Sequence, residues 1–324
     1  RVIKPHLSNT YLCPMPAIIE VNGLSKKFKD VTAVADLSFS VNEGDVYGFL
    51  GQNGAGKSTT IRMLLTLVQP THGSISIFGK NLFTHSKSIL KEVGAIIEKP
   101  DLYKYLSAYD NLAIFARMSG IKATKAFLME QLHLVGLEER AESKVKTFSQ
   151  GMKQRLGIAV ALVHDPKLIV LDEPTNGLDP QGIADMRNLI IGLSRERGKT
   201  ILVSSHLLSE IQLVANRMLI IHHGKKMVEG NAEELLDPSK SVISIETEDD
   251  VAARTVLQQS KWNAFLQPNS HELRFSMNKQ DVPALINDLV QMNFKLHSIN
   301  PMNSLEDFFL SLTTEPHHVE AGSN

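Results

Sequence analysis

The sequence contains a single cysteine, Cys13, among its 324 residues, so no disulfide can form within the chain. A lone thiol is typical of a protein that works in a reducing compartment such as the cytosol. No stretch reaches the roughly 18 consecutive apolar residues that a membrane-spanning helix requires. Any role in transport would therefore need a separate membrane subunit.

The chain also lacks an excess of either charge, because 34 basic residues stand against 35 acidic ones. Proteins that bind nucleic acid usually carry a basic surplus, so the composition gives no reason to expect nucleic acid as a partner. Internal repeats and low-complexity tracts are absent as well. The hydrophobic content of 43% is that of a globular protein, and the length favours two domains.

Short apolar or β-branched runs alternate with amphipathic stretches from residue 17 to about 235, which favours an α/β fold around a parallel sheet. A mostly helical insertion is expected over about 99–160, and residues 1–16 are interpreted as a tag or extension outside the fold. A helix is expected over 58–68. The expected strands include 17–21, 35–41, 45–50, 168–171 and 200–204.

Residues 238–313 follow the order β-α-β-β-α-β, which is typical of a small α+β ferredoxin-like domain. The expected elements are strands at 242–246, 264–267, 272–276 and 294–299 and helices at 251–259 and 282–292. The second helix shows apolar residues at i, i+3, i+4, i+7 and i+8 from Val282. A closing amphipathic helix is predicted over 304–312, and 314–324 are expected to form a flexible tail.

A glycine-rich segment carries the strongest signal for function. Residues 51–58, GQNGAGKS, match the phosphate-loop pattern G-x-x-x-x-G-K-[ST] between an expected strand and helix. The glycines let backbone N–H groups surround phosphates, and the helix N-terminus adds positive charge. Lys57 is expected to reach the β- and γ-phosphates, and Ser58 to ligate Mg²⁺. The predicted nucleotide-binding residues of this loop are Gly51, Asn53, Gly54, Ala55, Gly56, Lys57, Ser58 and Thr59.

Two adjacent acids, Asp172 and Glu173, end an apolar strand, and ligands of open α/β sheets bind beyond that end. Asp172 suits a role in holding the water shell of Mg²⁺. Glu173 suits a general base for the attacking water, a role typically worth about 10²–10⁴ in rate. His206 follows another expected strand and would contact the γ-phosphate if the two strands share a sheet. The alternatives are a solvated turn for the acids and a structural role for the histidine.

The ordered set of motifs resembles the ATP-binding subunits of ABC transporters over about residues 17–235. The resemblance implies a P-loop ATPase fold of ABC type, with a mixed sheet, an antiparallel β section and a helical subdomain, and it implies ATP and Mg²⁺ as cofactors. It places Phe28 where the family stacks an aromatic ring on adenine, although strand packing would also explain that residue. It places Asp179 in the loop that communicates between two sites.

A Ser-Gln-Gly turn, Ser149-Gln150-Gly151, occupies the position of the family's signature, which is usually Leu-Ser-Gly-Gly-Gln. Ser149 and Gly151, the pair that contacts phosphate in the family, are kept, whereas Gln150 is larger than glycine. Glu98 stands where the family usually has a glutamine that senses Mg²⁺ and contacts the membrane subunit. An ionised carboxylate only accepts hydrogen bonds and adds negative charge. Both departures, with the segment 304–310, resemble the subgroup that exports peptide antibiotics such as bacitracin and lantibiotics.

The signature predicts an active site that two chains share. Ser149 suits the N-cap of the following helix, which leaves a positive helix end free for an anion. The chain already has a phosphate loop for its own nucleotide, and in the family the signature of one subunit covers the γ-phosphate bound to the other. The resemblance therefore implies a homodimer, or a pair with a second ATPase subunit, that closes around two ATP and drives a transmembrane permease from the cytoplasmic side.

Two other functions share part of this pattern. A soluble ABC-type ATPase that acts on ribosomes or nucleic acid has the same core, but it usually carries two cores, long coiled-coil insertions or zinc-binding cysteines. A small-molecule kinase shares the phosphate loop and has no need of Ser149 or Asp179. The sequence leaves the transported substrate open, and export rather than import rests on the resemblance alone.

Overall fold

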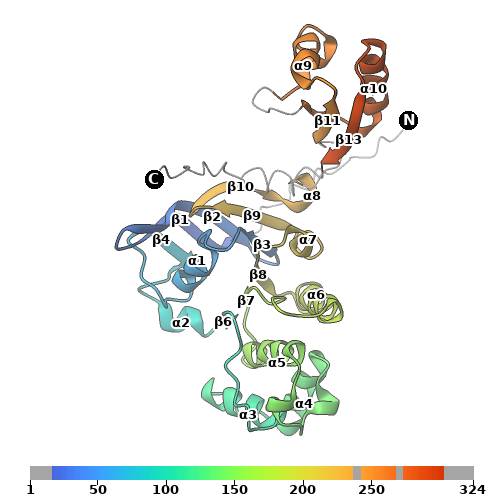
Figure 1. Cartoon of the computed structure of the whole chain (residues 1–324). Helices are drawn as coiled ribbons and strands as arrows, with labels where there is room; N and C mark the ends of the chain where they lie inside the picture. Colours follow the sequence, from blue (N-terminus) through green and yellow to red (C-terminus); the bar gives the residue numbers. More distant parts are fainter. Residues whose placement is uncertain (1–16, 236–241, 268–272, 303–324) are drawn as a thin grey trace, which may run out of the picture.

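A six-stranded sheet lies at the centre of the first part of the chain, in the strand order β10-β9-β3-β8-β7-β6. The computed structural model describes residues 17–235, 242–267 and 273–302 (Figure 1). Neighbouring strands from β9 to β6 run parallel, and only β10 pairs antiparallel, which confirms the predicted parallel sheet. The strands are β3 (Val46–Leu50), β6 (Val93–Ile96), β7 (Leu168–Asp172), β8 (Thr200–Ser205), β9 (Arg217–His222) and β10 (Lys225–Asn231).

The three central strands β3, β7 and β8 are buried along their whole length because side chains cover both faces of the sheet. Leu50 and Leu171 belong to the core on one face, together with residues of the helices that flank β7. Tyr47 and Val170 belong to the core on the other face, which the helix after β3 and a second sheet complete. This double covering explains the continuous apolar runs in the sequence.

The second sheet is antiparallel and has the order β2-β1-β4-β5. Its first two strands extend further than the sequence predicted and form a hairpin with Phe28 at its end. The strands are β1 (Ala17–Phe28), β2 (Val31–Asn42), β4 (His72–Ile77) and β5 (Lys80–Asn81).

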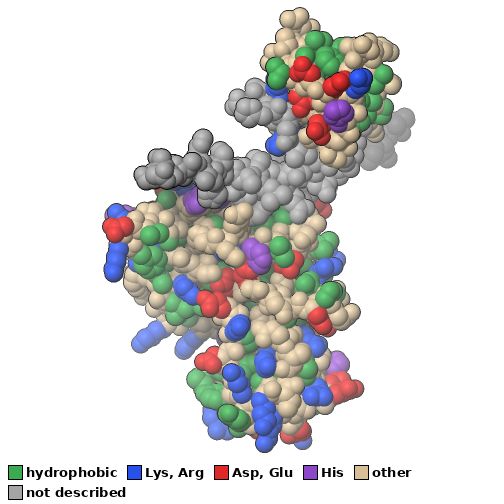
Figure 2. All heavy atoms as spheres, viewed as in Figure 1, with side chains coloured by type: hydrophobic (Ala, Val, Ile, Leu, Met, Phe, Trp, Pro, Cys, Tyr) green, Lys and Arg blue, Asp and Glu red, His purple; other side chains and the backbone are tan. Residues whose placement is uncertain are grey.

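Helices connect the parallel strands, and α3, α4 and α5 form the helical insertion at one end of the molecule (Figure 1). Among the described residues, no helix is both long and apolar enough to cross a membrane. On the face drawn in Figure 2, Lys and Arg side chains are frequent over this insertion, while the rest mixes both signs of charge. The helices are α1 (Lys57–Leu64), α2 (Ser86–Leu90), α3 (Ala108–Met118), α4 (Lys125–Leu134), η1 (Glu138–Arg140), η2 (Val145–Thr147), α5 (Gln150–Leu162), α6 (Pro180–Arg195), α7 (Leu208–Ile211) and α8 (Ala232–Leu235).

The helix predicted over 58–68 is wrong at its carboxyl end, because α1 ends at Leu64. Thr66 has a positive φ of 60°. Its N–H donates to Met63 O at 3.1 Å, and the N–H of Leu67 donates to Arg62 O at 2.9 Å. This pair of hydrogen bonds is a Schellman motif, which ends a helix by satisfying its last carbonyl groups. The apolar spacing continued past the end because residues after the turn still pack on the core.

A three-stranded antiparallel sheet of order β12-β11-β13 forms the last part of the described chain. Two helices pack on it, and its core is separate from the two others. The elements are β11 (Val242–Thr247), α9 (Asp250–Gln258), η4 (Lys261–Ala264), β12 (Leu273–Ser276), η5 (Lys279–Asp281), α10 (Val282–Gln291) and β13 (Leu296–Met302). The predicted helix over 304–312, the predicted tail 314–324 and the residues 1–16 lie outside the described residues.

The strand predicted over 264–267 is wrong, because only an isolated bridge from Leu266 to Phe275 forms there. The preceding residues make the 3-10 turn η4, in which Trp262 is 5% exposed. The Trp262 indole N–H donates to Asp288 Oδ2 at 2.9 Å. The Lys261 ammonium and then this indole hold the pKa of Asp288 below its usual value. Burial of Trp262 with its N–H satisfied therefore outweighs the weak strand propensity of the segment.

Candidate active site

The phosphate loop joins β3 to α1, and its backbone conformation requires glycine at two positions. Gly54 and Gly56 have φ values of 84° and 105°, a region that glycine adopts without strain. A Cβ at Gly56 would also lie 2.6 Å from Ala33 O on β2. Gln52, Asn53 and Gly54 are the exposed residues of the loop. The tip of the loop is thus open to solvent, while β2 of the hairpin approaches it closely at Gly56.

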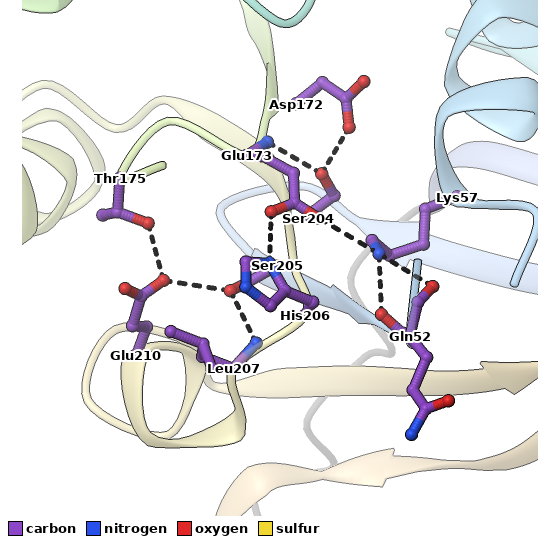
Figure 3. Close-up of polar contacts among 11 residues, drawn as sticks. Gln52, Lys57, Asp172, Glu173, Thr175, Ser204, Ser205, His206, Leu207 and Glu210 are labelled. Atoms are coloured by element: carbon purple, nitrogen blue, oxygen red, sulfur yellow. Dashed lines mark hydrogen bonds and ion pairs between the residues drawn. The ribbon is translucent and has the colours of Figure 1, made fainter. Parts of the chain in front are cut away.

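Lys57, the first residue of α1, is 4% exposed and folds back over the loop. Its ammonium donates to Gly51 O at 2.6 Å and to Gln52 O at 3.2 Å, and it lies 3.0 Å from Glu173 Oε1 (Figure 3). Ser58 and Thr59 follow in the first turn of α1 and are half-buried. The lysine therefore connects the phosphate loop to the carboxyl end of β7.

The strands β7 and β8 lie side by side, with Asp172 opposite Ser204 in the register. This confirms the expectation that the strands before Glu173 and His206 share one sheet. Ser204 Oγ donates to Asp172 Oδ1 at 2.6 Å and accepts from the N–H of Glu173 at 2.9 Å. The sequence did not single out Ser204, although two serines, Ser204 and Ser205, follow the apolar run of β8.

Glu173 lies between Lys57 and His206. One carboxylate oxygen pairs with Lys57, and the other forms a short hydrogen bond with His206 Nδ1 (Figure 3). The backbone of Glu173 has a φ of 50°, which a non-glycine residue adopts at a cost of about 1–3 kcal/mol. Its N–H bond to Ser204 helps to hold this conformation. Backbone strain of this kind concentrates at functional sites, so the geometry favours a chemical role for Glu173 over a solvated turn.

Asp172 has an oxygen that the protein leaves without a donor. The residue is 1% exposed, and within the described ranges its Oδ2 has no hydrogen-bond partner. Burying a carboxylate oxygen without a partner costs free energy. Hydrated Mg²⁺ is bound in proteins through carboxylate and hydroxyl oxygens, so this oxygen fits the water shell of such an ion. The residues present therefore fit a magnesium site next to the phosphate loop.

Two residues that the resemblance selected lie at the margins of this site. Phe28 is 46% exposed, and its ring lies 4.8 Å from the ammonium of Lys26. It lies at the end of the hairpin β1–β2, whose second strand approaches Gly56 at Ala33. Glu98 follows β6 with a φ of 58° and forms an ion pair with Arg62 of α1. The structure shows no contact between Glu98 and Asp172.

The signature residues lie on a different part of the molecule. Ser149 is the N-cap of α5, and its Oγ accepts from the N–H of Met152 at 3.2 Å. Gln150 and Gly151 make the first turn, and a Cβ at Gly151 would lie 3.8 Å from Leu178. Asp179 caps α6, with Oδ1 accepting from the N–H of Gly182 at 2.8 Å. Two capped helix N-termini thus lie close together, apart from the phosphate loop of the same chain (Figure 1).

The fold and the site define a nucleotide-binding α/β ATPase with a phosphate loop, a strand-end glutamate and a helical insertion. Residues 34–176 match a family model described as ABC transporter. The chain is 42% identical to the uncharacterized ABC transporter ATP-binding protein YhcH of Bacillus subtilis (strain 168), over 93% of this chain and 97% of that protein. It is 46% identical to the bacitracin transport ATP-binding protein BcrA of Bacillus licheniformis, over 76% of this chain and 80% of the relative.

The solved structures agree with this assignment. The structure of cbiO1 from Clostridium perfringens, part of the ABC transporter complex cbiONQ, superposes with a TM-score of 0.61 at 26% identity. The match covers 67% of this chain and 90% of that one. The chain therefore belongs to the ATP-binding proteins of ABC transporters. It binds ATP and is an ATPase of this family.

Proposed function

We propose that this chain powers an exporter of peptide antibiotics or of other amphipathic substrates. Two copies, or one copy and a second ATPase subunit, would close around two ATP at the cytoplasmic face of a separate transmembrane permease. The observation that carries the ATPase part is the position of Glu173 between Lys57 and His206 at the carboxyl end of the sheet. The likeness to a bacitracin transport ATP-binding protein supports the substrate class.

The contacts of Lys57 suggest how nucleotide prepares the general base. The lysine binds two loop carbonyls and pairs with Glu173. A triphosphate carries several negative charges, whereas the loop carbonyls are neutral and Glu173 carries one, so the Coulomb attraction of the ammonium to the phosphates is larger. ATP would therefore draw the ammonium toward its phosphates and release one oxygen of Glu173. That oxygen then takes the proton of the attacking water, while His206 holds the other.

Ser58 and Asp172 are the residues that would hold Mg²⁺ and its waters, and Glu98 would contribute from the end of β6. The unpartnered Oδ2 of Asp172 supports this role. When bound, the ion neutralises charge on the β- and γ-phosphate oxygens. Ser204 occupies Asp172 Oδ1, so Oδ2 is the oxygen that would accept from a water of the ion.

Replacing Asp172 by Asn is expected to raise the Mg²⁺ concentration for half-maximal ATPase activity by about 10–100-fold. This is the range found for residues that hydrogen-bond the direct ligands of a metal ion. The amide keeps the shape and the Ser204 contact but loses the charge. The measurement is phosphate release against Mg²⁺ at fixed ATP. The exposed Asp101→Asn is the matched control. An unchanged Mg²⁺ dependence in D172N would contradict the assignment.

The shared site rests on the capped helix α5. Ser149 satisfies one N–H of the first turn, and the remaining N–H groups and the helix dipole favour an anion. The phosphate loop of the same chain lies elsewhere, so a phosphate bound by another copy is the occupant that we propose. Asp179 at the start of α6 would then lie next to the partner's nucleotide, which matches the role that the family gives this loop.

The exporter proposal is tested by expressing the chain together with the membrane protein encoded beside it in a bacitracin-sensitive host. The minimal inhibitory concentration of bacitracin is expected to rise with the wild-type chain and to stay at the host's level with Glu173→Gln. A complex of the two proteins that hydrolyses ATP but protects from neither bacitracin nor a lantibiotic would contradict the substrate class. Purification with ribosomes in place of the membrane protein would contradict the transport role itself.

A further inference from the structure

One carboxylate connects the two loops that carry Glu173 and His206. Glu210 projects from the short helix α7, and its Oε2 accepts from Thr175 Oγ1 at 2.6 Å and from Ser205 Oγ at 2.9 Å (Figure 3). Thr175 lies two residues after Glu173, and Ser205 directly precedes His206. A single oxygen therefore joins the loop after β7 to the end of β8, directly before His206.

The hydroxyl of Ser205 is fixed from two sides. It donates to Glu210 and accepts from the N–H of Leu207 at 3.0 Å, which lies just beyond His206. The Ser205 hydroxyl thus links the residues before and after His206, and Glu210 fixes the position of this hydroxyl. Rotation of this segment would move the imidazole away from Glu173, because the two residues approach each other from separate loops.

The surroundings strengthen these hydrogen bonds. Ser205 is 2% exposed, and Glu210 lines a void of about 20 Å³ whose other walls include Pro174, Val203 and Ile211. Hydrogen bonds to an ionised acceptor are roughly twice as strong as neutral ones. Glu210 is half-buried, and this partial burial strengthens its bonds further. Within the described ranges, no lysine, arginine or histidine lies within ion-pair distance of Glu210. The two hydroxyl groups are therefore the hydrogen-bond donors that compensate the charge of this carboxylate.

We propose that Glu210 is a positioning residue for ATP hydrolysis. It holds the segment that carries Glu173 and the segment that carries His206 in a fixed position relative to each other. The inference rests on the proposed roles of Glu173 and His206. The hydrogen bonds of Glu210 go to Thr175 and Ser205 and not to the phosphate loop 51–58, so its loss leaves the binding of ATP intact. A misplacement of about 1 Å at a reacting group can reduce a rate by about 10²-fold, so its loss lowers turnover.

The test begins with kinetics of Glu210→Ala and Glu210→Gln in the full chain. We expect E210A to lower kcat by about tenfold or more, with KM and Kd for ATP within about threefold of the wild type. E210Q is expected to keep most of the activity, because its amide oxygen accepts from both hydroxyl groups. Glu233→Gln on α8, an exposed carboxylate, is the control and should behave as wild type. Wild-type turnover in E210A would overturn the proposal.

A double-mutant cycle separates positioning from general destabilisation. In the E210A background, His206→Ala is expected to cost much less than it costs in the wild type, because the histidine is already misplaced. Losses that multiply would overturn the proposal. If E210A does not fold, Thr175→Val and Thr175→Ser replace it, and only the valine should lower kcat. If the single substitution H206A loses no activity, the proposed site is contradicted. If H206A loses much activity while E210A turns over ATP at the wild-type rate, only the role of Glu210 is contradicted.

Discussion

Replacing Lys57 by Ala is expected to weaken ATP binding by about 100-fold or more. The ammonium lies at the phosphate loop, where it binds Gly51 O, and charge-assisted hydrogen bonds contribute about 1.5–3 kcal/mol each. Two such bonds to phosphate oxygens amount to at least two powers of ten in Kd. Isothermal titration with ATP in the presence of Mg²⁺ measures the effect directly.

The control for this substitution is Lys80→Ala, because Lys80 is an exposed lysine of β5. Thermal unfolding of both variants shows whether K57A remains folded, since the substitution also removes a partner of Glu173. A folded K57A that binds ATP as tightly as the control would contradict the assignment of the phosphate loop.

Replacing Glu173 by Gln is expected to reduce turnover by about 10²–10⁴, the range that general-base catalysis contributes. The amide keeps the size and the contact with His206 but cannot take a proton from water. ATP binding should be unchanged or tighter, because the lysine no longer has to leave a charged partner to reach the phosphates. Phosphate release at saturating ATP and equilibrium binding together separate the two effects.

The matched control here is Glu43→Gln, which removes an exposed carboxylate before β3. It should hydrolyse ATP at the wild-type rate. Equal rates for E173Q and E43Q would show that Glu173 is not the base, and the contact between Glu173 and His206 would then be structural.

The chemistry-bearing residues were predictable because each lies where a short motif meets the end of a strand. Residues 51–58 fix their own conformation through glycine, and the acids at 172 and 173 end a buried parallel strand. Parallel strands deliver their carboxyl ends to one edge, so His206 was placed correctly once its strand was assigned to the same sheet.

Other features depend on contacts that no local pattern encodes. The helix α1 ends because Thr66 has a left-handed backbone conformation, although apolar residues at helical spacing continue beyond it in the sequence. The segment 264–267 turns instead of pairing because Trp262 is buried and bonded to Asp288. Glu210 was not predicted from the sequence, because its proposed role depends on contacts with the hydroxyl groups of Thr175 and Ser205, which lie far apart in the chain.

An active site that needs two chains requires two E173Q chains to associate around ATP, and the mass of this protein in solution shows whether they do. Size-exclusion chromatography with light scattering is run with ATP and Mg²⁺, and again without nucleotide. We predict a particle of twice the 35.9 kDa chain with ATP and the single chain without it. Adding Ser149→Arg should return the ATP sample to the single chain. A 35.9 kDa particle at saturating ATP, with binding intact, would contradict the shared site.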